Sequence, residues 1–210
     1  MMGFFTRLKQ PVSVFFTLLI MPLFCIHNAL ADPSSMGELY QMTREPLLVQ
    51  ALVDLQSIGS DGESTLESLK AHQTHILFQT MAQLGPQYAG NDALSLVNQT
   101  TGQQIIYISH RHQTAPPQAL AALIKHESMH HDIENSLLEE AAAWTEEGLM
   151  WARMKQQYPD LANIPIKMSP LVDRLNAILV LIQNDKLATE IVKNPAYKSL
   201  PMTSPCFETH

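Results

Sequence analysis

The sequence has few cysteines and few basic residues, and both shortages limit what the protein can be. Only two cysteines occur in 210 residues, and Cys25 lies in an N-terminal segment that we expect to be removed. Cys206 would then have no partner within the chain, so no internal disulfide is predicted. Lysine and arginine number 13 against 20 acidic residues. This acidic balance argues against nucleic acid or an anionic membrane surface as a partner.

Long apolar runs are missing beyond the N-terminus, so no later segment is predicted to insert stably into a membrane. The N-terminus itself has the pattern of a secretory signal peptide, because Arg7 and Lys9 precede an apolar run over residues 12–26. We expect residues 1–31 to be cleaved after Ala31, which leaves a periplasmic or secreted protein. Its charge would be 11 minus 20, or −9, because cleavage removes two basic residues and no acidic one. A retained N-terminal anchor is the alternative.

The remaining chain is predicted to form one domain over residues 32–194, followed by a flexible C-terminal tail over residues 195–210. The expected class is α+β and predominantly helical. Apolar periodicity and capping signals predict helices over five ranges: 36–58, with a possible break at Pro46, 64–84, 117–133, 136–157 and 169–182. Two extended segments, 93–98 and 103–109, are separated by a Thr-Gly turn and predict a small β-hairpin.

The strongest chemical signal is the motif His126-Glu127-Ser128-Met129-His130. Two histidines four positions apart lie on the same face of a helix, so both imidazoles can reach one tetrahedral zinc ion. Glu127 would lie near the open coordination position, where a carboxylate can take a proton from water. The motif also follows apolar residues on the same face, which predicts a buried site rather than a surface coincidence.

A third ligand is expected from the next helix, which offers four carboxylates: Glu139, Glu140, Glu146 and Glu147. Ser136 and Glu139 fit a capping box, which would turn Glu139 toward the helix start. Glu140 shares an apolar stripe with Trp144 and Trp151, where a carboxylate is costly unless it is paired or binds a metal. We therefore predict Glu140 as the third ligand, with Glu139 as the main alternative and Glu147 as a support behind the ligands.

These residues resemble the gluzincin group of zinc metallopeptidases, in which His-Glu-x-x-His is followed by a glutamate on a later helix. Here the pattern is His126-Glu127-x-x-His130 and then Glu140-x-x-Ala143. The resemblance covers residues 103–151 and implies a zincin-like fold, with an edge strand at 103–109 that pairs with an extended substrate. It also implies one zinc ion per chain and peptide-bond hydrolysis by a zinc-bound water that Glu127 activates. The spacing of nine residues between His130 and Glu140 is shorter than usual in that group.

Other polar side chains near the motif are candidates for weaker roles. Support behind the ligands or in the transition state could come from Glu147, Glu139, His131, His110 and Tyr107, and less strongly from His112 and Tyr158. His131 points about 100° away from His130 on a helix, so we expect it at the rim. Trp144 and Trp151 are predicted to pack in the core, and His72 and His75 are assigned no role.

Two other function classes fit parts of the pattern. A non-catalytic zinc-binding or inhibitory protein could retain the zincin fold, but the intact Glu127 favours an enzyme. A di-metal carboxylate bundle could use Glu127-x-x-His130, but it needs a second Glu-x-x-His that this sequence lacks. The leading hypothesis is therefore a zinc metallopeptidase whose partner is a peptide or protein substrate. No pattern selects an oligomeric state.

Overall fold

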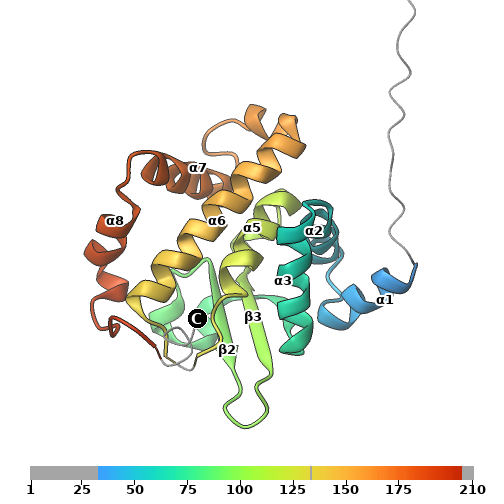
Figure 1. The fold of residues 1–210 in the computed structure, drawn as a ribbon, viewed down its shortest axis with the longest axis horizontal. Coiled ribbons are helices and arrows are strands. Elements are labelled where there is room, and N and C mark those ends of the chain that lie inside the picture. Colours follow the sequence, from blue (N-terminus) through green and yellow to red (C-terminus); the bar gives the residue numbers. More distant parts are fainter. Residues whose placement is uncertain (1–32, 133, 205–210) are drawn as a thin grey trace, which may run out of the picture. The chain divides into compact units, whose positions relative to one another are not determined.

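The computed structural model describes residues 33–132 and 134–204 (Figure 1). The expected signal peptide, Cys25 and Cys206 lie outside these ranges. Within them the fold is α+β and mostly helical, as predicted, with one three-stranded sheet. None of the helices in these ranges is long and apolar enough to cross a membrane.

The first predicted helix is divided at its proline. Helix α1 spans Pro33–Met42 and helix α2 spans Pro46–Ser57. Pro46 occupies the first turn of α2, where a missing backbone N–H costs nothing. One face of α2 is buried in the core, through Leu48 and Leu52 among others.

The predicted helix over residues 64–84 is wrong. Helix α3 spans Ser60–Ala71, strand β1 follows at His75–Gln79, and a short helix α4 spans Met81–Leu84 before the turn η1, Pro86–Tyr88. Ile76 and Phe78, alternate residues of β1, are buried. The backbone of β1 pairs with a strand about 30 residues further on, and this distant pairing outweighs the local helical pattern.

The sheet contains the predicted hairpin, but its order corrects one expectation. Strand β2 spans Ala93–Val97, strand β3 spans Gln104–Ser109, and the two are antiparallel. Strand β1 pairs with the other side of β3 in parallel, so the order is β1-β3-β2. The segment 103–109 is therefore the central strand and not an edge strand, which agrees with the burial of Ile106 and Ile108.

Helix α5 lies between helices α2 and α6 (Figure 1). It begins at Pro117, after the turn η2 at His110–His112, and ends at Glu127, six residues earlier than predicted. Helix α6, Leu137–Gln157, matches its prediction closely. Its N-cap is the predicted Ser136, whose hydroxyl accepts the backbone N–H of Glu139 at 3.2 Å.

Helix α7, Pro170–Gln183, packs against α6 after the turn η3 at Pro159–Asn163. A glycine permits this approach, since a methyl group on Gly148 would lie 2.5 Å from Cδ1 of Ile182. Helix α8, Leu187–Lys193, and the turn η4, Pro195–Tyr197, were not predicted.

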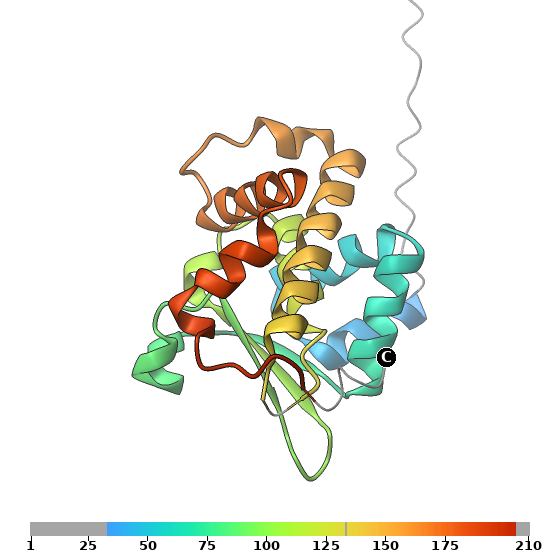
Figure 2. The same ribbon diagram turned by 60° about the vertical axis from the view of Figure 1, so that its left-hand side comes forward.

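The segment after η4 returns to the beginning of α6 (Figure 2). The backbone N–H groups of Leu137 and Leu138 donate to the carbonyls of Pro201 and Met202, at 2.9 and 3.1 Å. First-turn N–H groups of a helix have no partner inside the helix. The C-terminal segment therefore completes the first turn of α6.

Candidate metal centre

The two histidines of the motif come together at the end of α5, although only His126 lies on the helix. Beyond Glu127 the chain continues in tighter turns, with N–H of Met129 bonded to the carbonyl of His126 and N–H of His130 bonded to the carbonyl of Glu127. The ring centroids of His126 and His130 are 5.1 Å apart. The predicted proximity is thus confirmed, while the predicted continuous helix is not.

A buried glutamine on β3 holds this turn in place. The side-chain amide of Gln104 donates to the carbonyls of Glu127 and His130 at 3.0 and 2.9 Å, and to the hydroxyl of Ser95 at 2.8 Å. Its own oxygen accepts the hydroxyl proton of Thr74 at 2.8 Å. Carbonyls at a helix end lack partners within the helix, so Gln104 substitutes for the missing turn. Sequence patterns gave no sign of this role.

Glu140 meets both imidazoles, which makes a group of three buried ligand atoms. Its Oε2 lies 3.8 Å from Nε2 of His126, and its Oε1 lies 3.7 Å from Nε2 of His130. The three residues, which are 3–5 % exposed, each offer one atom within 4.8 Å of the others. Ligands about 2.0–2.1 Å from a tetrahedral zinc ion stand about 3.4 Å apart, so a modest contraction would complete the site.

The hydrogen bonding of Glu140 also fits a cation. Oε1 accepts the side-chain amide of Asn135 at 2.9 Å. Oε2 is buried and has no hydrogen-bond partner among the described residues. A buried carboxylate oxygen without a partner is costly, and a metal ion bound by the three residues would remove that cost. The residues present therefore suit a metal ion, without selecting one metal from another.

Two further carboxylates lie behind the imidazoles. Nδ1 of His130 donates to Glu139 Oε1 at 2.8 Å, and Nδ1 of His126 is 3.1 Å from Glu147 Oε2, a distance suited to an ion pair but without full hydrogen-bond alignment. Ligand histidines commonly present their second nitrogen to a carboxylate in this way. Glu139 is therefore not the third ligand, and its carboxylate bonds His130 rather than the helix start; it takes the third predicted position, a support behind a ligand.

These carboxylates determine the charge at the centre. Burial alone lowers the pKa of His130, but the hydrogen bond to Glu139 and the charges of Glu127 and Glu140 outweigh it and raise that pKa to about 9. A metal ion would replace the proton that this environment favours, so metal binding should release a proton.

Glu127, the last residue of α5, is buried beside the group. Its burial raises the pKa of its carboxyl group, and the charges of Glu140 and Glu147 add to the rise, while His126 and His130 oppose it. A raised pKa makes a carboxylate a better proton acceptor near neutral pH. The arrangement can therefore combine a metal ion with a base one residue away from a ligand.

Residues far along the chain complete the surroundings, and motif spacing could not have found them. Arg174 on α7 bonds both carboxylate oxygens of Glu147. The hydroxyl of Ser204 donates to Glu139 Oε2 at 2.9 Å. Tyr197 accepts the indole N–H of Trp144 at 3.1 Å. Burial and the nearby charge of Glu140 raise the pKa of Tyr197 well above its usual range.

The other predicted support residues lie outside the ligand group. His110 is near Thr80, with Nδ1 at 3.4 Å from its hydroxyl. Tyr107 pairs with Leu94 on β2 and with Leu77 on β1. The remaining two weaker candidates bond elsewhere: His112 to Asp92 and Tyr158 to Asp54 and Ser57. Trp151 is fully buried, as expected of a core residue.

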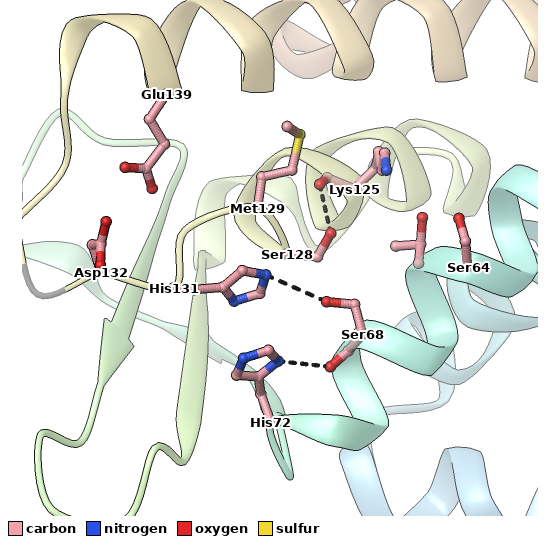
Figure 3. Close-up of a pocket in the computed structure, with 10 residues that line it drawn as sticks. Ser64, Ser68, His72, Lys125, Ser128, Met129, His131, Asp132 and Glu139 are labelled. Atoms are coloured by element: carbon pink, nitrogen blue, oxygen red, sulfur yellow. Dashed lines mark hydrogen bonds between the residues drawn. The ribbon is translucent and has the colours of Figure 1, made fainter. Parts of the chain in front are cut away.

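His131 lines a separate pocket of about 550 Å³ together with His72 (Figure 3). Their rings stack at 4.0 Å, and Ser68 contacts both of them. Glu139 belongs to the wall of this pocket, whereas the three candidate ligands do not. The pocket therefore adjoins the metal centre through Glu139, the carboxylate behind His130, and through Ser128 and Met129 of the motif.

Comparison with models of protein families, with curated proteins and with solved structures finds no match to this chain. What is shown for this site is its geometry. His126, His130 and Glu140 form a buried group that could hold a metal ion.

Proposed function

We propose that the protein is a zinc-dependent metallopeptidase with a zincin-like catalytic arrangement, acting outside the cytoplasm. One observation carries the proposal. His126, His130 and Glu140 converge in a buried group, and Glu127 lies next to it in the chain. Imidazole and carboxylate ligands in this number suit zinc that keeps one position open for a substrate or water. Two histidines and one glutamate also suit other divalent metals, and we propose zinc among them.

The roles of the side chains follow from their chemistry. Zinc, when bound, supplies a Lewis acid that polarises a carbonyl and eases the deprotonation of water. His126, His130 and Glu140 hold it, and Glu139 and Glu147 orient the two imidazoles from behind. Glu127 accepts the proton of the attacking water and can return it to the departing amine.

An extended substrate would pair with β2, because β3 is closed on both sides. Among the described residues, β1 and β2 each have a strand partner on one side only, and β2 is the one nearer the candidate metal centre. It also packs near α5, and the hydroxyl of Ser95 lies 3.4 Å from the carbonyl of His130. Pairing of a peptide with a free strand edge gives affinity through main-chain hydrogen bonds.

The direct test compares Glu127→Gln with the wild type. We expect the variant to retain one zinc per chain and to lose hydrolysis of an unstructured protein such as casein, because the amide cannot accept the proton. Glu146→Gln is the matched control, since its carboxylate is more than a third exposed and belongs to the next helix. Hydrolysis at the wild-type rate by Glu127→Gln would refute the proposed mechanism.

The burial of the group supports a second candidate, a non-catalytic zinc-binding protein. The ligands are 3–5 % exposed, and they do not line the 550 Å³ pocket. A metal enclosed in this way could serve stability or an interaction. Stoichiometric zinc together with no hydrolysis by the wild type, and a large loss of thermal stability on chelation, would favour this candidate over the peptidase.

A further inference from the structure

We infer that Arg174 is a positioning residue of the metal site, which fixes the imidazole of His126 through Glu147. The inference rests on the zinc-binding part of the proposed function. Arg174 lies on α7, 27 positions beyond Glu147, and it belongs to none of the motifs in the sequence. Its guanidinium forms ion pairs with two carboxylates, Glu147 and Asp92.

The carboxylate of Glu147 is completely buried. An ionised carboxylate in such a place needs a compensating charge and hydrogen bonds. The guanidinium of Arg174 supplies both, because one of its NH₂ groups contacts both oxygens of Glu147. Glu147 Oε2 is at the same time 3.1 Å from Nδ1 of His126. One carboxylate thus lies between the arginine and the ligand.

Arg174 is itself held by neighbouring side chains. The second NH₂ group of its guanidinium donates to Asp92 Oδ2 at 2.7 Å, and the guanidinium lies 5.5 Å from the ring centre of Trp144. Asp92 is held in turn by Arg111, at 2.6 Å, and by His112. The guanidinium is therefore fixed between two acids. A planar, forked cation suits this double contact better than the single ammonium of lysine.

The position of Glu147 affects the ring of His126. An ionised carboxylate facing Nδ1 can only accept a hydrogen bond, so it favours the tautomer with the ring proton on Nδ1 and the lone pair on Nε2. Nε2 is the atom that faces Glu140. By holding Glu147 against His126, Arg174 favours the tautomer and the ring orientation that bind a metal. Removing the guanidinium would leave Glu147 free to turn or to bond elsewhere.

The experiment measures zinc affinity by competition with a chromogenic chelator, in the wild type and in Arg174→Gln, Arg174→Lys and Arg153→Gln. Loss of a support behind a ligand typically weakens metal binding about 10–100-fold. We expect that loss in Arg174→Gln, a partial recovery in Arg174→Lys, and little change in Arg153→Gln. Arg153 is the matched control, because it is an arginine of α6 whose ion pair is with Asp61 and not with Glu147 or Asp92.

A second readout separates positioning from general stability. NMR of the ring nitrogens in the zinc-loaded protein should show the His126 proton on Nδ1 and protected from exchange with water. We expect faster exchange of this proton in Arg174→Lys, with melting temperature compared alongside. If Arg174→Gln does not fold, Asp92→Asn replaces it: this variant frees one side of Arg174 and should weaken zinc binding less than the lysine variant does.

The outcomes distinguish this inference from the proposed function. Wild-type zinc affinity in both Arg174 variants, an equal loss in Arg153→Gln, or a His126 proton on Nε2 would overturn the inference. A wild-type protein that binds no zinc would overturn both. A protein that binds zinc but hydrolyses no peptide, with the expected order among the variants, would remove the peptidase and leave the positioning role of Arg174 intact.

Discussion

Among the described residues, two pairs of histidines have their rings in contact, and the pairs differ in geometry and in polar partners. His126 and His130 meet edge to face, at 5.1 Å and 68°, with ring nitrogens directed at carboxylates on α6. His72 and His131 stack nearly parallel, at 4.0 Å and 9°, with Ser68 as their shared polar neighbour. In the first pair the nitrogens converge on Glu140, whereas stacking directs the nitrogens of the second pair outward along the ring planes.

The contrast is sharpest between two consecutive residues. Surrounding carboxylates raise the pKa of His130 to about 9 despite its burial. Burial and then the neighbouring His72 lower the pKa of His131 to about 4. Both residues are histidines in the turn that follows α5, so residue type and position do not predict a metal ligand. The carboxylates that face the ring decide the difference.

The largest expected effect comes from removing one histidine of the first pair. His126→Ala and His130→Ala should each abolish stoichiometric zinc binding, because two remaining ligands hold the ion poorly. His72→Ala and His131→Ala should each keep one zinc per chain. Elemental analysis after dialysis against a weak chelator measures all four. Zinc lost from His131→Ala as completely as from His130→Ala would remove the distinction between the pairs.

Next in size is the comparison of the two neighbouring glutamates on α6. Glu139→Ala removes a hydrogen bond to a ligand, so we expect zinc affinity to fall about 10–100-fold. Glu140→Ala removes a ligand and should lower the affinity further. Chelator competition gives both values, with Glu146→Ala as the unaffected control. The reverse order would make Glu139 the third ligand.

A smaller effect is expected at Gln104, whose side chain supports the first pair. Gln104→Ala leaves buried carbonyls of Glu127 and His130 without their donor, and should lower the free energy of unfolding by about 1–3 kcal/mol. Zinc affinity should fall as well, because His130 is less well held. Gln103→Ala is the control on the adjacent residue. Urea unfolding measures the first quantity, and an equal loss in both variants would contradict the assigned role.

The smallest effects concern pH in zinc-free protein. The pKa of His130 is raised, so its stabilising contribution is full below an unfolded pKa of about 6.5 and disappears as pH rises toward 9. The pKa of His131 is lowered, so its contribution is present above about 6.5 and disappears as pH falls toward 4. His130→Gln should therefore reduce the change in the free energy of unfolding between about pH 6.5 and 9. His131→Gln should reduce the change between about pH 6.5 and 4. Urea unfolding from pH 4 to 9 measures both changes, and wild-type pH dependence in the variants would contradict these pKa shifts.

The sequence predicted the ligand group well because its signals are local. His126, His130 and Glu140 lie within 15 positions, and a short corner between two helices brings them together. The strand β1 escaped prediction because its apolar residues continue the pattern of the preceding helix, while its partner is β3, far along the chain. Missing β1 also produced the second error, since without it β3 would be an edge strand.

The supports of the site could not be predicted from spacing. Asp92 and Arg174 are 82 positions apart and meet only because the folded chain brings the residue before β2 within reach of α7. Arg174 did carry a weak signal, because it is the only basic residue of α7, whose residues are mostly apolar. Ser204 carried none, since a serine near the end of a chain is ordinary until its carboxylate partner is known.

The distant supports also affect the order in which the site can mature. During synthesis from the N-terminus, the stretch from His126 to Glu140 emerges before Arg174 and Ser204 exist. That stretch could already take up a metal ion, but only in a loose and exchangeable form. If Arg174 has the proposed positioning role, secure retention would begin only once α7 docks and the C-terminal segment bonds the first turn of α6. The rate at which a chelator strips the metal from newly made chains should therefore report whether folding has finished.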